Sequence, residues 1–271
     1  MTPSRRNCRP LVELEAQLRV EFSAPDGPSL AGLAEVIAGL ADEPPEAGLI
    51  TTGLDRLAEG APAICAEADA VLNYVFVDLG FKGNHREYYH PDNSYLHRVI
   101  DTRLGIPITL AIVAIEIGRR LGIALTPVGF PGHFLLGDGS RADRWFDPFE
   151  AGQTLDVNGC QDLLARSHPG AQLEPGHTAV LDPAEVGHRM LNNLRHIHLT
   201  MGDLSRATAV TQLAVALPGA GVAHRIELLK LLNATGRFDA AAEQHEILAL
   251  LDSEHEAAHH AAATRLRFRL N

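Results

Sequence analysis

Apolar side chains cover nearly the whole circumference of one predicted helix near the middle of the chain. Pro107 fixes a backbone angle that suits the first turn of a helix. The apolar positions that follow are Ile108, Leu110, Ala111, Ile112, Val113, Ala114, Ile115 and Ile117. A helix that is apolar on most sides is buried. The pattern therefore predicts a buried helix from Pro107 to about Gly122, with Glu116, Arg119 and Arg120 facing outward.

Three short β-rich segments follow this helix, at residues 125–130, 133–136 and 145–147, with Pro-Gly and Gly-Asp-Gly turns between them. We expect an antiparallel meander. His133 opens the second segment and Asp147 closes the third, so strand pairing can bring both side chains to one end of the sheet. An imidazole held by a carboxylate is the base-and-orienter half of a catalytic triad. The same pair can also be a structural hydrogen bond between two strands.

In a triad with this arrangement of helix and strands, the nucleophile is a cysteine on the first turn of the helix. No cysteine occupies that position in this sequence. The helix dipole lowers the pKa of a thiol on the first turn, but the sequence of that turn is IPIT, at residues 106–109. Thr109 is a candidate nucleophile there, and its alternative role is that of a capping or back-bonding threonine. The cysteines Cys8, Cys65 and Cys160 lie far apart without CxxC spacing, which indicates reduced thiols.

The spacing of this region resembles that of the transglutaminase-core superfamily. The matching positions are Gly105, Ala111, Gly122, Ile123, His133 and Asp147. Pro107 occupies the position of the superfamily's cysteine, so the resemblance implies a domain that lacks the nucleophile. More specifically, HPDNSYLHRVIDTRLGIPITL followed by PGHFLL and FDPFEAGQTL resembles the bacterial SirB-type proteins. In that family the missing cysteine is a common trait.

The resemblance implies an α+β fold with a papain/transglutaminase-like core, in which a buried helix packs with an antiparallel sheet. We expect residues 1–28 to be poorly ordered or loosely packed. Residues 29–175 form the transglutaminase-like domain, whose N-terminal part is helical and begins at the capping residue Ser29. Asn93 and Ser94 are expected to cap a further helix over residues 95–103. Residues 176–271 form tetratricopeptide-like helices.

A repeat supports this interpretation of the last segment. MGDL at residues 201–204 and TGRF at residues 235–238 lie 34 residues apart, with Ala207 and Ala241 at the same offset. Thirty-four residues is the tetratricopeptide period, in which glycine makes the tight turn and alanine lets paired helices approach closely. An ordinary helical bundle is the alternative. Tetratricopeptide arrays usually bind peptides or partner proteins, so we expect a protein or peptide partner.

The composition and net charge of the chain argue against two classes of partner, nucleic acids and membranes. The chain has 271 residues, 46% of them hydrophobic, and a formal net charge of −11. An acidic surface repels a polyphosphate backbone, so we expect no nucleic-acid ligand. The longest apolar run is too short to span a bilayer, and we expect a cytoplasmic protein without a membrane partner.

One motif suggests zinc but lacks support. HEAAH at residues 255–259 matches HExxH, which on a helix can place two histidines and a general base at zinc. No histidine or carboxylate follows His260 to complete a three-ligand site, so a solvated helix face is the better interpretation. We expect no metal and no cofactor.

Two classes of function therefore stay open. The first is a non-catalytic module or scaffold that binds a protein or peptide in the old catalytic cleft and through the helical repeats. The second is an amide-bond hydrolase or acyltransferase that uses Thr109 or a water activated by His133, with Asp147 orienting the base. Candidate binding residues at the cleft are Asn93, Ser94, Pro107, Gly132 and Phe134.

Overall fold

The computed structural model describes residues 8–25, 27–63 and 66–268. They form two compact units. The first is Arg19–Val186 with a short N-terminal stretch ending at Arg9, and the second combines Pro10–Leu18 with Gly187–Asn271. The first unit mixes helices with a sheet and the second is helical, so the α+β class is confirmed. The two units divide within the helix α8, Pro183–Thr200, whereas the sequence predicts a domain boundary near residue 176.

The first unit contains six α-helices among its described residues: α2 (Leu30–Ala38), α3 (Leu49–Glu59), α4 (Ala68–Asn73), α5 (Leu96–Thr102), α6 (Pro107–Arg120) and α7 (Val157–Ser167). A π-helical turn, Tyr74–Asp78, extends α4. The strands β3 (Leu125–Val128), β4 (Leu135–Asp138), β5 (Arg141–Asp147) and β6 (Gln153–Leu155) form an antiparallel sheet in chain order. The short strands β1 (Lys82–Gly83) and β2 (Leu104–Gly105) pair in parallel.

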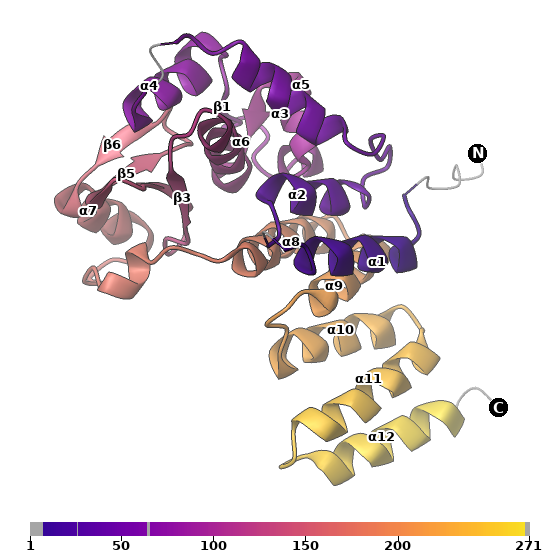
Figure 1. The fold of residues 1–271 in the computed structure, drawn as a ribbon. Helices are drawn as coiled ribbons and strands as arrows, with labels where there is room; N and C mark the ends of the chain where they lie inside the picture. Colours follow the sequence, from indigo (N-terminus) through magenta and orange to yellow (C-terminus); the bar gives the residue numbers. More distant parts are fainter. Residues whose placement is uncertain (1–7, 26, 64–65, 269–271) are drawn as a thin grey trace. The chain divides into compact units, whose positions relative to one another are not determined.

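Helix α6 is the centre of the first unit, as the apolar pattern predicts. It contacts β3 and β4 on one side and α2, α3 and α5 on another, and Figure 1 shows it between these layers. Leu110, Ile112, Val113 and Ile117 are fully buried. At its start, an added side chain at Gly105 would lie 2.8 Å from the Thr109 hydroxyl, so only glycine allows β2 to approach the helix this closely.

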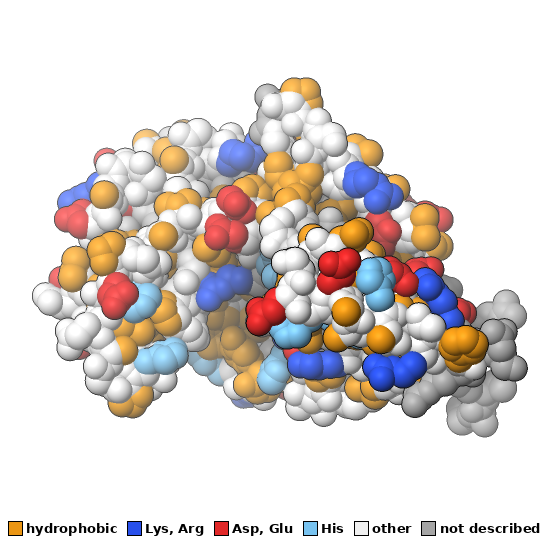
Figure 2. Space-filling view, turned by 90° about the horizontal axis from the view of Figure 1, so that it is seen from below, with side chains coloured by type: hydrophobic (Ala, Val, Ile, Leu, Met, Phe, Trp, Pro, Cys, Tyr) orange, Lys and Arg blue, Asp and Glu red, His pale blue; other side chains and the backbone are white. Residues whose placement is uncertain are grey.

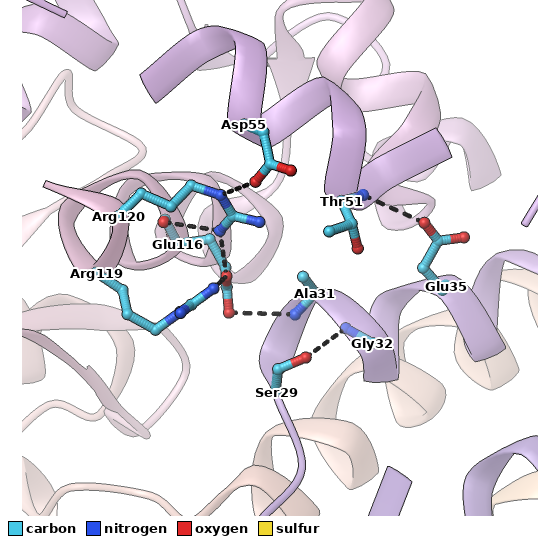
Figure 3. A network of polar contacts seen from close by, with 9 residues as sticks. All are labelled: Ser29, Ala31, Gly32, Glu35, Thr51, Asp55, Glu116, Arg119 and Arg120. Carbon is cyan, nitrogen blue, oxygen red and sulfur yellow. Dashed lines mark hydrogen bonds and ion pairs between the residues drawn. The ribbon is translucent and has the colours of Figure 1, made fainter. Parts of the chain in front are cut away.

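Glu116 does not face outward, contrary to the prediction, because it is 1% exposed. Its Oε1 accepts a hydrogen bond from the backbone N–H of Ala31 at 3.2 Å, and its Oε2 lies 2.5 Å from Arg120 Nη1 and 3.1 Å from Arg119 Nη2. Arg120 also donates to Asp55 on α3 at 2.6 Å. Figure 3 shows this network joining α6 to α2 and α3. A protein interior tolerates a carboxylate when the carboxylate is ion-paired and hydrogen-bonded in this way.

Several element boundaries differ from those predicted. Strand β4 begins at Leu135, and His133 lies in the loop before it. Strand β6 was not predicted. Asn93 and Ser94 do not cap α5, whose N-cap is Tyr95; they belong to a 3-10 turn, Pro91–Ser94. Ser29 caps α2 as predicted, since its hydroxyl accepts from Gly32 N–H at 2.9 Å.

The helical unit repeats the turn geometry that the sequence suggests. Helices α9 (Leu204–Ala216), α10 (Val222–Ala234), α11 (Phe238–Leu251) and α12 (Glu256–Phe268) follow α8. Gly202 and Gly236 both adopt positive φ, 74° and 72°, in the turns before α9 and α11. Ala207 and Ala241, in the first turns of these helices, are both fully buried. The 34-residue spacing in the sequence therefore corresponds to a repeated structural feature, in which a glycine turn is followed by a buried alanine at the start of the next helix.

The N-terminal segment differs from the prediction where the structure describes it. Residues 11–22 were expected to be poorly ordered or loosely packed, but they form the helix α1, Leu11–Phe22. Leu14 and Leu18 of this helix are 0% and 1% exposed. Residues 1–7 of the predicted segment lie outside the described residues. None of the described helices is both long and apolar enough to cross a membrane.

Removing the Glu116 carboxylate will destabilise the first unit. We expect Glu116→Ala to lower the free energy of unfolding by about 3 kcal/mol, because Arg120 and the Ala31 N–H lose their buried partner. Trp145, the single tryptophan of the chain, is buried in this unit and reports its unfolding by fluorescence in urea. Arg119→Ala is the control: that side chain is 60% exposed, and we expect a loss below about 1 kcal/mol. Equal losses for both variants would contradict the role given to Glu116.

Candidate functional site

The His133–Asp147 pair forms as the sequence predicts. His133 Nε2 lies 2.9 Å from Asp147 Oδ1. The pairing of β4 with β5 matches Leu136 with Phe146, so the residues just before β4 lie beside the end of β5. Because a carboxylate only accepts, Nε2 carries the proton of the neutral imidazole, and Nδ1 is the nitrogen that could act as a base.

Asp147 is held in place by its own loop. Its Oδ1 also accepts from the backbone N–H groups of Phe149 at 2.9 Å and Glu150 at 3.3 Å, and its carbonyl accepts from Gly152 N–H at 2.8 Å. The residue is 4% exposed, whereas the His133 side chain is 17% exposed. The pair is thus a buried carboxylate that orients an imidazole at the surface.

The start of α6 offers no free hydroxyl for such a base. Thr109 is fully buried, and its Oγ1 donates to the carbonyl of Asn93 at 2.8 Å, with the carbonyl of Ile106 a further acceptor at 3.1 Å. The same oxygen accepts from Ile106 N–H at 3.1 Å. This is the capping geometry that the sequence left as the alternative to a nucleophile. Pro107 occupies the first position of the helix.

A loop over residues 84–93 lies next to the start of α6. Asn84 N–H donates to Gly105 O at 2.9 Å, which ties the loop to β2. The Asn93 side chain closes the loop by donating to the carbonyls of Glu87 at 2.6 Å and Tyr88 at 3.1 Å, and by accepting from Asn84 Nδ2 at 3.0 Å. Asn93 is 3% exposed, so its role here is to shape the loop.

Phe149 connects this loop to the His–Asp pair, which the sequence analysis missed. Its ring centroid lies 4.3 Å from that of His85 and 5.6 Å from that of Tyr88. An added side chain at Gly83 would lie 2.6 Å from the Phe149 ring. A series of contacts therefore joins His85 and Tyr88 through Phe149 and the buried Asp147 to His133, and we call this set of residues the His133 face. Its aromatic members were visible in the sequence only as a His/Tyr-rich loop and a phenylalanine two residues after Asp147.

Most of the predicted binding residues are buried. Ser94 and Phe134 are 1% and 3% exposed, and Pro107 is also buried. Gly132 is exposed, with φ of 68°, and makes the turn before His133. Burial keeps the first three from contacting a ligand in this conformation.

The other candidate groups do not join the site. Cys160 is fully buried, and burial together with Asp156 raises the pKa of its thiol to about 11, so it is protonated and unreactive at neutral pH. Cys8 is exposed. Cys65 lies outside the described residues.

The histidines of the HExxH segment pair with neighbouring side chains. His255 Nδ1 lies 3.1 Å from Asp252 Oδ2, His260 Nδ1 lies 2.8 Å from Glu246 Oε2, and the Nδ1 atoms of His245 and His259 lie 2.9 Å apart. Figure 2 looks onto α12 and shows histidines interspersed with acidic and basic side chains. Within the described part of the chain, no group of three or more histidine, cysteine, aspartate or glutamate side chains could hold a metal ion.

The chain is similar to a known protein family and to several known proteins. A family model described as the transglutaminase-like superfamily matches residues 40–192, more than half of the chain. A UPF0162 protein of Xylella fastidiosa (strain Temecula1) is 36% identical over 196 residues, which cover 69% of this chain and 68% of that protein. A UPF0162 protein of Pseudomonas aeruginosa is 36% identical over 134 residues, about half of each chain. The human F-box only protein 21 is 38% identical over 133 residues, which are 20% of its length and 45% of this chain.

The hydroxyl of Thr109 can be tested as a structural group. We expect Thr109→Val to lower the free energy of unfolding by about 2 kcal/mol, because the buried Ile106 N–H and Asn93 carbonyl lose their partner. Thr109→Ser keeps the hydroxyl and should lose less than about 1 kcal/mol. Trp145 fluorescence in urea measures both. A valine variant as stable as the serine variant would show that the hydrogen bonds of Thr109 do not hold the start of α6.

Proposed function

Because the chain belongs to the transglutaminase-like superfamily, we propose that it is a non-catalytic member that binds a peptide or protein segment on the His133 face. We further propose that it is a SirB-type protein whose helical unit is a short tetratricopeptide array. The main observation in support of the proposal is the structure of the first turn of α6. By the resemblance, Pro107 occupies the position of the superfamily's nucleophile, and the Thr109 hydroxyl is buried and hydrogen-bonded to backbone groups.

The chemistry of the His133 face suits recognition of an extended segment. Tyr88 of this face and the adjacent Tyr89 are 39% and 60% exposed, and their ring centroids lie 5.2 Å apart. Exposed aromatic rings provide large contact area with little loss of side-chain entropy. His133, oriented by Asp147, adds a polar side chain to this surface. An apolar or aromatic side chain on the rings, with a backbone group at His133, is the occupant that this surface favours.

The similarity to F-box only protein 21 is consistent with a self-contained module. The match takes up one fifth of that protein, so the region recurs in a chain of different length and context. A binding domain can be reused in this way because its ligand surface lies within the domain itself.

A hydrolase remains the second candidate, and one observation favours it. His133 is oriented by Asp147 in the manner of a general base, and such a base can activate a water without a protein nucleophile. Backbone N–H groups at the start of α6 would then stabilise the oxyanion. In that case His133→Ala abolishes turnover and leaves the fold intact.

The position of the lost nucleophile can be tested by restoring it. We expect Pro107→Cys to place a thiol whose pKa lies below the ordinary 8.5 or so, because the helix dipole and the imidazole both favour the thiolate. The absorbance of the thiolate at 240 nm measures this pKa, in a background where Cys8 and Cys65 are serine. Adding His133→Ala should raise the pKa by about one unit. An unchanged pKa in the double variant would contradict the assignment of the Pro107 position to the nucleophile site.

The two candidate functions separate in a binding experiment with mass detection. Peptides selected from a display library on the wild-type chain are incubated with it and recovered. A binding module returns each peptide with its mass unchanged, and we expect Tyr88→Ala to weaken binding by about tenfold. Val157→Ala, an exposed apolar residue of α7, is the matched control. Cleavage by the wild type that His133→Ala abolishes would overturn the non-catalytic proposal in favour of the hydrolase.

A further inference from the structure

Helices α11 and α12 are joined by a hydrogen bond between two imidazoles. His245 Nδ1 on α11 lies 2.9 Å from His259 Nδ1 on α12, and the ring centroids lie 5.2 Å apart. A hydrogen bond between two nitrogens needs one donor and one acceptor, so only one of the two Nδ1 atoms can carry a proton. The bond can therefore form with both rings neutral or with one ring protonated, and it is lost when both rings are protonated.

The apolar contact that holds α12 is small. The helix packs on α11, and Figure 1 shows α11 between α10 and α12. Of the described part of α12, Ala263 and Leu266 are the buried residues, whereas five residues of α9 are buried. His259 precedes Ala263 and Leu266 by four and seven residues, a spacing that places all three on one face of the helix. The imidazole pair therefore lies within the contact between α11 and α12 and forms a large part of it.

Charged and titratable groups surround the pair on three helices. Those that face the pair or its neighbours are Glu246 and Asp252 on α11, His255, His260 and Arg265 on α12, and Arg225 on α10. Asp252 Oδ2 lies 3.9 Å from His259 Nε2, within the range of an ion pair, while Glu246 is already paired with His260 at 2.8 Å. Asp252 can therefore balance one proton on the pair, whereas a second proton adds charge beside Arg265 and a ring that is already charged.

We propose that α12 is a proton-sensitive cover of α11, which docks while the His245–His259 pair holds at most one added proton and loosens when both rings are protonated. Ala263 and Leu266 of this cover belong to a hydrophobic cluster whose other buried members are Leu228 and Leu232 on α10 and Ala241 and Ala242 on α11. Loosening of α12 exposes that cluster. The proposal concerns the helical unit, and it does not depend on peptide binding at the His133 face.

The direction of the pH dependence follows from the environment of His245. Burial, followed by the charge of His259, lowers the pKa of His245 below its ordinary value of about 6.5. A histidine whose pKa is lower in the folded chain stabilises the fold above that ordinary value, and this stabilisation is lost as the pH falls below it. His255 acts in the opposite direction, because its hydrogen bond to Asp252 raises its pKa. That side chain is 59% exposed, so solvent screens its ion pair and the pair between the helices decides the direction.

Amide hydrogen exchange of the full chain at pH 7.5 and pH 5.0 tests the proposal, once the intrinsic exchange rate at each pH is divided out. We expect the open fraction of α12 to increase about tenfold at pH 5.0, and that of α8 and α9 to change less than twofold. The double variant His245→Gln, His259→Gln keeps two side chains that can hydrogen-bond and removes their titration, so its increase should be below twofold. His255→Gln, on the same helix but outside the pair, is the matched control and should keep the tenfold increase.

A second measurement needs no variant that has to fold. Nuclear magnetic resonance of the histidine rings in the wild-type chain should show the pair titrating in two steps that are separated by about one pH unit or more, since the first proton opposes the second. Two independent steps at one common pH near the ordinary value would overturn the proposal. So would an open fraction of α12 that does not change with pH, or a tenfold increase that persists in the double variant. An equal increase in all helices of this unit would also overturn it, because the whole unit would then unfold.

Discussion

The packing of the first unit depends on one buried side chain, the Glu116 carboxylate, which forms ion pairs and a hydrogen bond inside the core. Helix α6 is enclosed by other elements, so Glu116 near its C-terminal end has no access to water. A buried carboxylate without partners costs several kcal/mol. Its partners come from the last turn of α6 and from the first turn of α2, and Arg120 continues the network to α3. The carboxylate therefore fixes how α2 and α3 sit on α6, which apolar contacts alone would specify less strictly.

The position of α6 in turn determines the geometry of the His133 face. The glycine before the helix allows β2 to lie against it, β2 pairs with β1, and β1 leads into the loop that packs on Phe149. The backbone N–H of Phe149 donates to the same carboxylate oxygen that orients His133. Each step is a direct contact, such as the 4.3 Å between the ring centroids of His85 and Phe149. A displacement at the start of α6 would be transmitted along this series of contacts to the imidazole.

The sequence predicted those features that depend on local pattern. An all-apolar helix after a proline, three strands separated by glycine turns and a repeated glycine-alanine spacing all follow from short-range rules, and the structure contains them. The pattern could not predict the burial of Glu116, because its N–H partner on Ala31 lies 85 residues away in sequence. It also misassigned Asn93, which suits a helix cap equally well but here closes a loop. Phe149 was missed because its contacts come from a loop more than 50 residues earlier.

The His133–Asp147 pair has a structural role that requires no catalysis. Asp147 accepts from three donors at one oxygen, and two of them are backbone N–H groups of the turn that follows. Losing this carboxylate would release the turn and with it Phe149, so the residue is needed for the shape of the surface. Proline at the start of α6 is likewise favourable for the helix, because it has no N–H to leave unpaired and its φ is already helical. A domain with proline in place of a thiol would thus have a more stable start of α6, and it would still need Asp147 for the turn that follows β5. The geometry of the His133–Asp147 pair can therefore be explained by the hydrogen bonds that shape this part of the surface.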